Sequence, residues 1–113
     1  PYLDQSKILA YCRAKELIFM AYCPLARGRM FTDPVLGDIA RSRRKTIAQV
    51  ALRWLIQQEI VAPLPRSANP AHMAESLDVF NFTLSDEEMK RIFALKRPDG
   101  RIANPKGRAP AWD

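Results

Sequence analysis

Residue types that often carry chemistry in small proteins are scarce in this sequence. The two cysteines, Cys12 and Cys23, lack CxxC or Cys/His ligand spacing, so we expect two buried free thiols. The single histidine, His72, has no metal-ligating neighbours in the sequence. The longest apolar run, residues 17–26, is too short to span a bilayer and contains Pro24. Free thiols suit a reducing compartment, so we expect a cytoplasmic location.

The remaining composition is sufficient for one folded domain. A chain of 113 residues should bury roughly two-thirds of the surface that it exposes when unfolded. Apolar residues make up 48% of the chain, which is typical of globular proteins. The sequence begins at Pro1, without Met and without a signal-peptide pattern, so we expect a segment of a longer protein.

Positive charge is concentrated in the middle of the chain. Eighteen Lys and Arg against twelve Asp and Glu give a net charge of +6. Between residues 27 and 66 only three residues are acidic, and eight are basic: Arg27, Arg29, Arg41, Arg43, Arg44, Lys45, Arg53 and Arg66. This surplus favours an anionic partner, which could be a phosphate, a nucleic acid or an acidic surface. The alternative is a set of solvated surface arginines.

Hydrophobic periodicity predicts helices that alternate with two short strands. The runs LIFMAY (17–22) and IVAPL (60–64) are short and continuously apolar, as strands buried on both faces of a parallel sheet are. Helices are predicted over residues 6–15, 34–43, 47–58, 70–79 and 85–95. This order indicates an α/β fold. Two parallel strands do not form an independent sheet core, so either the chain is a fragment or partners supply further strands.

Several helix starts are marked by capping residues. Asp33 and Asn69 are each followed by proline, which is favoured at the first helical position. Ser85 and Glu88 have capping-box spacing. The helix over 47–58 has its apolar residues at i, i+3, i+4, i+7 and i+8, namely Ile47, Val50, Ala51, Trp54 and Leu55.

The loop after the second strand has the chemistry of an anion-binding corner. Ligands bind at the C-terminal edge of parallel strands in barrels and open sheets. Arg66 offers a fork of donors that matches phosphate oxygens, and Ser67 adds a hydroxyl. The helix that starts after Asn69 presents free N–H groups, and His72 lies in its first turn. The alternative is a capped helix beside a surface arginine.

Four stretches together resemble the C-terminal part of the aldo-keto reductases: YCPLARG (22–28), KTIAQVALRWLI (45–56), PRSANPAHMAES (65–76) and FTLSDEEMKRI (82–92). They occur in the family's order and cover nearly the whole chain. The opening PYLDQ resembles the segment after the family's sixth barrel strand. The resemblance implies the C-terminal portion of a TIM (β/α)8 barrel over residues 1–96, with the two strands as the seventh and eighth. Residues 97–113 are then an irregular tail that packs on the barrel through Ile102 and Trp112.

The resemblance also implies a cofactor site. The family reduces aldehydes or ketones with a nicotinamide cofactor, usually NADPH. Its loop after the seventh strand lies along the pyrophosphate, which implicates Cys23, Pro24, Leu25, Ala26 and Gly28. Its segment after the eighth strand grips the adenosine 2′-phosphate and the adenine, which implicates Arg66, Ser67, Ala68, Asn69, His72, Glu75 and Ser76.

Four of these positions depart from the family's common residues. The family commonly has Ser at Cys23, Lys at Arg66, Arg at His72 and Asn at Ser76. Arg66 keeps the charge, whereas a neutral imidazole at position 72 weakens the second phosphate contact. Ser76 shortens the adenine contact. We therefore expect NADPH as the cofactor, with NADH as an alternative.

The family's catalytic groups are not expected in this chain. The catalytic Asp, Tyr, Lys and His of the family lie before this sequence begins, and Tyr2, Tyr11 and Tyr22 match none of their positions. We assign no catalytic residue and no metal ligand, and we expect the chain alone to be inactive, because the reaction needs a tuned proton donor. The expected partners are a nicotinamide dinucleotide and, in a full-length parent, a small carbonyl substrate, without nucleic acid or membrane.

Two other functions remain open at this stage. Residues 35–56 contain two helices joined by a basic turn, which is the form of a DNA-binding helix-turn-helix. Its second helix would offer mainly Gln49, Arg53 and Gln57 to a ligand. Alternatively, the chain is a non-enzymatic remnant that self-associates or binds a partner through its exposed strand edges.

Overall fold

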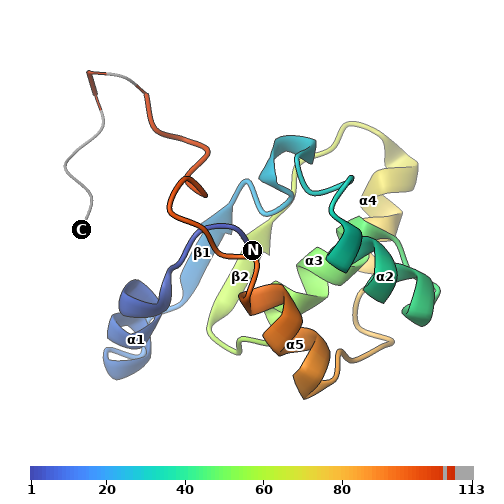
Figure 1. Cartoon of the computed structure of the whole chain (residues 1–113), viewed down its shortest axis with the longest axis horizontal. Coiled ribbons are helices and arrows are strands. Elements are labelled where there is room, and N and C mark those ends of the chain that lie inside the picture. Colours follow the sequence, from blue (N-terminus) through green and yellow to red (C-terminus); the bar gives the residue numbers. More distant parts are fainter. Residues whose placement is uncertain (106, 109–113) are drawn as a thin grey trace.

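The predicted elements are all present, in the predicted order, in the computed structural model, which describes residues 1–105, 107 and 108. Their observed ends differ from the predicted ones by at most two residues. In chain order the observed elements are α1 (Ser6–Ala14), β1 (Phe19–Tyr22), the 3₁₀ turn η1 (Ala26–Gly28), α2 (Pro34–Arg43), α3 (Ile47–Ile56), β2 (Val61–Leu64), α4 (Pro70–Leu77) and α5 (Asp86–Phe93) (Figure 1). The turn η1 was not predicted.

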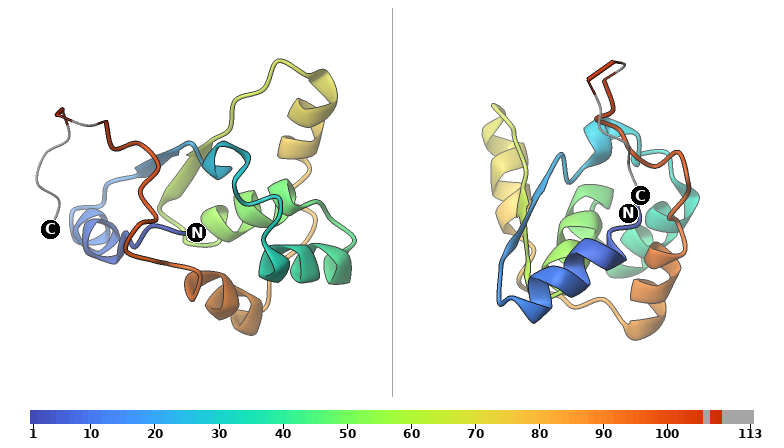
Figure 2. Two further views of the ribbon diagram at one scale, coloured as in Figure 1. Left: turned by 45° about the horizontal axis from the view of Figure 1, so that its top comes forward. Right: turned by 90° about the vertical axis from the view of Figure 1, so that its left-hand side faces the viewer.

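The two strands pair in parallel, as the sequence predicted. Phe19 pairs with Val61, and Tyr22 pairs with Leu64, so both strands end at the same edge. The connection between them contains α2 and α3. Figure 2 shows α3 in a central position, between the sheet and the pair α2 and α5. The loops that follow β1 and β2 therefore leave the sheet side by side.

The prediction that both faces of the strands are buried was wrong. Met20 and Tyr22 are 62% and 65% exposed. Successive side chains of a strand point to opposite faces, and Met20 and Tyr22 share a face with their partners Ala62 and Leu64. The other face is covered, since Val61 is buried and α3 packs on β2. The open face gains no cover because only two strands are present in the described part of the chain.

Helix α3 supplies the centre of the core. Val50, Ala51 and Leu52 are almost fully buried, and the ring of Trp54 meets Phe93 of α5 edge-on at 5.1 Å. The helix begins at a capping box in which the Thr46 hydroxyl accepts the N–H of Gln49, while the Gln49 side chain accepts the N–H of Thr46. This reciprocal arrangement satisfies two N–H groups that the helix itself leaves unpaired.

The predicted helix caps are confirmed, since Asp33 accepts N–H groups at the start of α2 and Ser85 forms a capping box with Glu88 at the start of α5.

A partly buried ion pair joins α2 and α5. Arg43 donates through Nε and Nη2 to the Glu88 carboxylate, at 2.9 Å and 2.5 Å. The Arg43 guanidinium therefore lowers the pKa of Glu88, and the Ser85 N–H bond adds to that effect.

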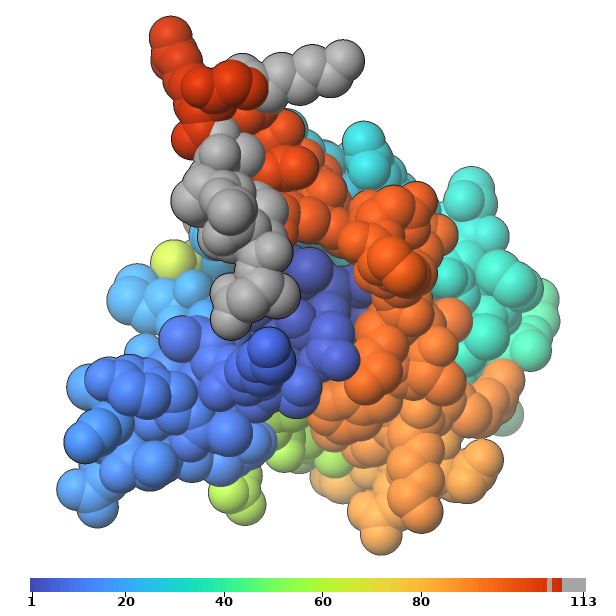
Figure 3. Space-filling model, turned by 60° about the vertical axis from the view of Figure 1, so that its left-hand side comes forward, coloured from blue at the N-terminus to red at the C-terminus, as the bar shows by residue number. Residues whose placement is uncertain are grey.

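The first residues of the chain pack against the segment that follows α5 (Figure 3). The buried Tyr2 accepts the N–H of Arg97 at its carbonyl, lies under the Arg97 guanidinium and donates its hydroxyl to Asp33 at 2.8 Å. Gly100 lies directly against the Tyr2 carbonyl. Ile102 packs on the core. Trp112, the other apolar residue of the predicted tail, lies outside the described residues, and the division at residue 97 stays a prediction.

The contacts of α3 argue against a DNA-binding helix-turn-helix. Gln49 was expected on the exposed face but is only 6% exposed. Arg53 donates to the Gln57 side chain and to the carbonyl of Val79, and Gln57 donates to the carbonyl of Leu84. The polar face of α3 is therefore occupied by the segment between α4 and α5. None of these three side chains is left to enter a DNA groove.

Candidate functional site

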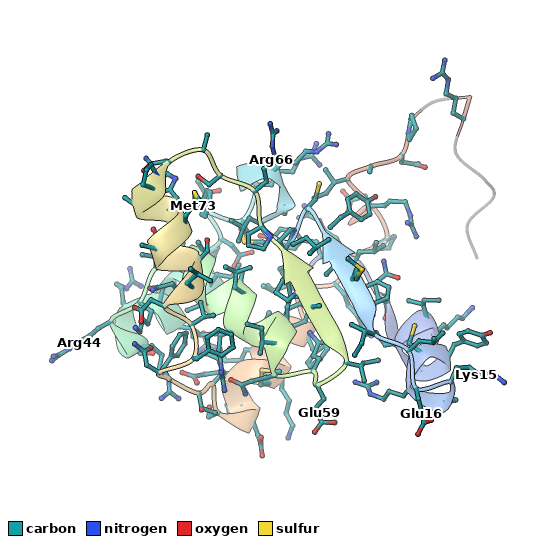
Figure 4. All side chains as sticks on the ribbon, turned by 180° about the vertical axis from the view of Figure 1, so that it is seen from behind. Lys15, Glu16, Arg44, Glu59, Arg66 and Met73 are labelled. Atoms are coloured by element: carbon teal, nitrogen blue, oxygen red, sulfur yellow. The ribbon has the colours of Figure 1, made fainter. Side chains whose placement is uncertain are left out.

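The candidate site lies where the two parallel strands end. Residues 23–28 follow β1, and residues 65–69 follow β2 and lead into α4. Figure 4 shows Arg66 at the end of β2, with its side chain directed away from the sheet. Asn69 caps α4 by accepting the N–H of Ala71 at 2.9 Å, and the Ser67 hydroxyl accepts the N–H of Asn69. Local capping chemistry thus fixes where the helix starts.

The first loop has an unusual backbone. Cys23, Ala26 and Arg27 have φ values of 50°, 50° and 52°, and Gly28 follows at 84°. Left-handed conformations are rare outside glycine because the Cβ atom crowds the backbone. The turn is held by bonds from the N–H of Ala26 to Cys23 and from the N–H of Gly28 to Leu25, and Ala26 is buried. The fold therefore imposes this shape on the loop.

The two loops enclose a cleft of about 550 Å³, which we call the Arg66 cleft. The predicted residues that line it are Leu25, Gly28, Arg66, Ser67, His72, Glu75 and Ser76. Arg27, Phe31, Thr46 and Ile47 line it as well and were not predicted. Arg27 could have been predicted, because it is a basic residue within the loop after β1. Thr46 could not, because it reaches the cleft only through the packing of α3 against α4.

The other predicted residues are elsewhere. Cys23, Pro24 and Ala26 line a separate cavity of about 240 Å³ beside β1 and the first residues of the chain. Ala68 and Asn69 line neither cavity. Cys12 is buried as expected, but Cys23 is only half-buried, because it begins the loop at the sheet edge. The expected reducing compartment stays a prediction.

Polar contacts position α4 against the cleft, since no residue of this helix is buried. The Gln49 amide donates to the carbonyls of Glu75 and Asp78, at 3.3 Å and 3.0 Å. The Thr46 hydroxyl donates to the Glu75 carboxylate. Lys45 pairs with Asp78 at 3.0 Å and lowers the pKa of that carboxyl. Helix α4 is therefore tied to the start of α3 rather than packed into the core.

Charges of both signs line the cleft, with positive charge in excess. The side chains of Arg66 and Arg27 have no hydrogen-bond or ion-pair partner within the described part of the chain. The Glu75 carboxylate accepts a hydrogen bond from the Thr46 hydroxyl and keeps its negative charge. Two guanidinium groups beside the start of a helix form a site suited to an anion such as a phosphate.

Two classes of site find no support in the described residues. No group of three or more His, Cys, Asp or Glu side chains is placed there to hold a metal ion. The same residues include no helix with the length and apolar character needed to cross a membrane.

Two parallel strands joined through helices, with a cleft at their C-terminal ends, are the architecture of a portion of an α/β barrel. The model of the Aldo/keto reductase family matches residues 1–97. The chain belongs to this family, whose members are oxidoreductases, and it forms the C-terminal portion of the family's TIM barrel.

Individual relatives agree with this assignment. The chain is 40% identical over 107 residues to aldo-keto reductase family 1 member A1 of Xenopus tropicalis. This match covers 86% of the chain and 32% of that relative. It is 35% identical over 105 residues to glyoxal reductase of Bacillus subtilis (strain 168), in a match that covers 93% of the chain and 38% of that relative. The chain thus spans about a third of the length of these relatives.

Solved structures give the same fold. A structure described as a 2,5-diketo-D-gluconic acid reductase B covers the whole chain at 45% identity, with a TM-score of 0.94, while the chain covers 40% of that structure. A point mutant of Gox0644 in complex with NADPH matches 88% of the chain at 36% identity, with a TM-score of 0.81, and the match covers 36% of that structure.

Proposed function

We propose that this chain is the cofactor-binding portion of an NAD(P)H-dependent aldo-keto reductase that reduces aldehydes or ketones. The observation that carries the proposal is the Arg66 cleft, in which an unpaired guanidinium lies beside the start of α4 at the strand ends. A relative bound to NADPH supports the choice of ligand. In this proposal the cleft holds the adenosine 2′-phosphate and the adenine, and the left-handed loop 23–28 lies along the pyrophosphate.

The proposal assigns binding but not catalysis to this chain. A tyrosine that donates its proton to a carbonyl needs cationic neighbours that lower its pKa. For Tyr2 the net effect is the opposite, because burial and its hydrogen bond to Asp33 outweigh the nearby Arg97 guanidinium and raise its pKa to about 12. We therefore propose that the chain alone is inactive and that the reaction requires groups from the remainder of the barrel.

Arg66→Ala tests the 2′-phosphate role. A charge-assisted hydrogen bond to a phosphate contributes about 1.5–3 kcal/mol, so we expect NADPH binding to weaken by about one to two orders of magnitude. NADH, which lacks the 2′-phosphate, should lose much less. Binding of both cofactors is measured by titration calorimetry. Arg29→Ala is the matched control, because Arg29 is an exposed arginine that lines neither cavity. Equal losses for NADPH and NADH would contradict the assignment.

A second candidate function, self-association, is favoured by the open face of the sheet. Met20, Tyr22 and Leu64 are exposed there, and within the described residues β1 pairs only with β2. A strand added along β1 would pair with the backbone groups that β1 leaves open at the edge of the sheet. Light scattering should then give a discrete oligomer, whereas a folded monomer would argue against this candidate.

A further inference from the structure

Thr46 lies in the short link between α2 and α3, where its side chain lines the Arg66 cleft. The residue is exposed. Its hydroxyl accepts the N–H of Gln49 at 3.2 Å and donates to the Glu75 carboxylate. One oxygen atom therefore joins the start of α3 to α4 at the edge of the cleft, so a chemical change at this atom acts on both helices.

The residues that precede Thr46 form a basic run. Residues 43–45 are two arginines and a lysine, and Ile47 follows the hydroxyl residue. Among the Ser and Thr residues of the chain, Thr46 alone has arginine at both the third and the second position before it, whereas Thr32 has arginine only at the third. Protein kinases discriminate between substrates by the charge pattern beside the acceptor hydroxyl. Arginine at these two positions is the pattern that arginine-directed kinases select.

The two arginines differ in how easily a partner can reach them. Arg44 is exposed, extends away from the fold in Figure 4, and its side chain has no hydrogen-bond or ion-pair partner within the described residues. Arg43 is paired with Glu88 but partly exposed, so an acidic group of a kinase must replace Glu88 there. Residues 44–46 belong to neither helix, so only the adjoining helical turns need to open for the acceptor to be presented.

We infer that Thr46 is a phosphorylation site for an arginine-directed protein kinase, and that the phosphate closes the Arg66 cleft to anionic ligands. In the reaction the Thr46 oxygen forms a bond to the γ-phosphorus of ATP, the bond between that phosphorus and the bridging oxygen breaks, and ADP leaves. The hydroxyl proton passes to a base of the kinase. The effect on the cleft rests on the proposed function, because it concerns the same site.

The phosphate changes the charges of the cleft in two ways. It carries a charge of about −1.5 to −2 at pH 7 and cannot donate to Glu75, so phosphate and carboxylate repel each other. It also shares the cleft with the guanidinium groups of Arg27 and Arg66, where it competes with an external anion. The start of α3 tolerates the phosphate, because the free N–H groups of a helix favour negative charge. Phosphorylation therefore keeps the cap of α3 and loosens α4.

Phosphorylation is tested on the purified chain with ATP and the catalytic subunit of cyclic-AMP-dependent protein kinase. Mass spectrometry should locate one phosphate, at Thr46, in the unsubstituted chain and in Thr46→Ser. Arg44→Gln should slow incorporation about tenfold, as the loss of one charge-assisted hydrogen bond does. The matched control Arg41→Gln should not, because Arg41 lies outside the recognised positions and is paired with Asp38. No incorporation at Thr46, or equal rates in Arg44→Gln and Arg41→Gln, would overturn the inference.

The effect on the cleft is measured by calorimetry with NADPH and by amide hydrogen exchange, before and after phosphorylation. We expect the phosphorylated chain to bind NADPH about tenfold more weakly, and the amides of α4 to exchange faster while those of α3 stay protected. Kinase-treated Thr46→Ala should behave like its untreated form. Unchanged affinity in a phosphorylated chain that binds NADPH overturns the closing of the cleft and leaves the proposed function intact. If neither form binds NADPH, the proposed function fails, and incorporation at Thr46 with the exchange of α4 still decides the inference.

Discussion

Replacing Gly100 by alanine should destabilise the fold by about 3 kcal/mol, the upper end of the usual cost of overpacking. A Cβ at this position would lie 1.9 Å from the Tyr2 carbonyl oxygen and 2.4 Å from its carbon. Both atoms belong to the backbone, so no side chain can rotate away to relieve the contact. The segment after α5 would have to leave Tyr2, which breaks the bond from the Arg97 N–H and the stacking of the Arg97 guanidinium.

Gly37→Ala is the control for this substitution. Gly37 lies inside α2, and a Cβ there would meet no atom within 4 Å. Alanine should therefore stabilise the chain by about 0.5–1 kcal/mol, the usual difference between glycine and alanine in a helix interior. The free energy of unfolding of both variants is measured by urea titration. The account of Gly100 is wrong if the two variants shift the urea midpoint in the same direction.

Gln49→Ala should cost about 2 kcal/mol and also weaken dinucleotide binding. The Gln49 side chain is buried, accepts the N–H of Thr46 and donates to the carbonyls of Glu75 and Asp78, so alanine removes these three hydrogen bonds. Each such bond contributes about 0.5–1.5 kcal/mol to stability. Because α4 has no buried residue of its own, the loss should also displace His72 and Glu75 from the Arg66 cleft.

Gln58→Ala separates the two effects. Gln58 is equally buried, at 6% exposed, but its amide donates only within its own helical turn, to the Trp54 carbonyl at 3.1 Å. Urea unfolding gives the stability of each variant, and calorimetry gives its affinity for NADPH. We expect both variants to lose stability and only Gln49→Ala to lose affinity. Equal affinities would show that the contacts of Gln49 do not position α4.

Features that depend on neighbours in the sequence were predictable. The caps at Asp33, Asn69 and Ser85 act within three residues of themselves, so the helix starts could be placed from residue types alone. The four quoted stretches were sufficient to identify the family, which the family model confirms. The convergence of the loops after β1 and β2 also followed, because parallel strands end at one edge.

Features that depend on contacts between distant segments were not predictable. Gln49 occupies a polar position on its own helix and becomes buried only because α4 crosses it. The basic cluster between residues 27 and 66 looked uniform, yet Arg43 finds its carboxylate 45 positions away, at Glu88. The exposure of Met20 depends on which strands are present to cover it. In each case the deciding partner is remote in the sequence.

The lack of buried residues in α4 also bears on how easily this helix opens. Segments with few buried contacts open locally, so we expect the opening free energy of α4 to lie below that of global unfolding. Its backbone amide hydrogens then exchange with solvent faster than those of α3. A ligand that bridges α4 and the loop after β1 must supply the free energy that holds the helix in place, which lowers its apparent affinity and slows the exchange.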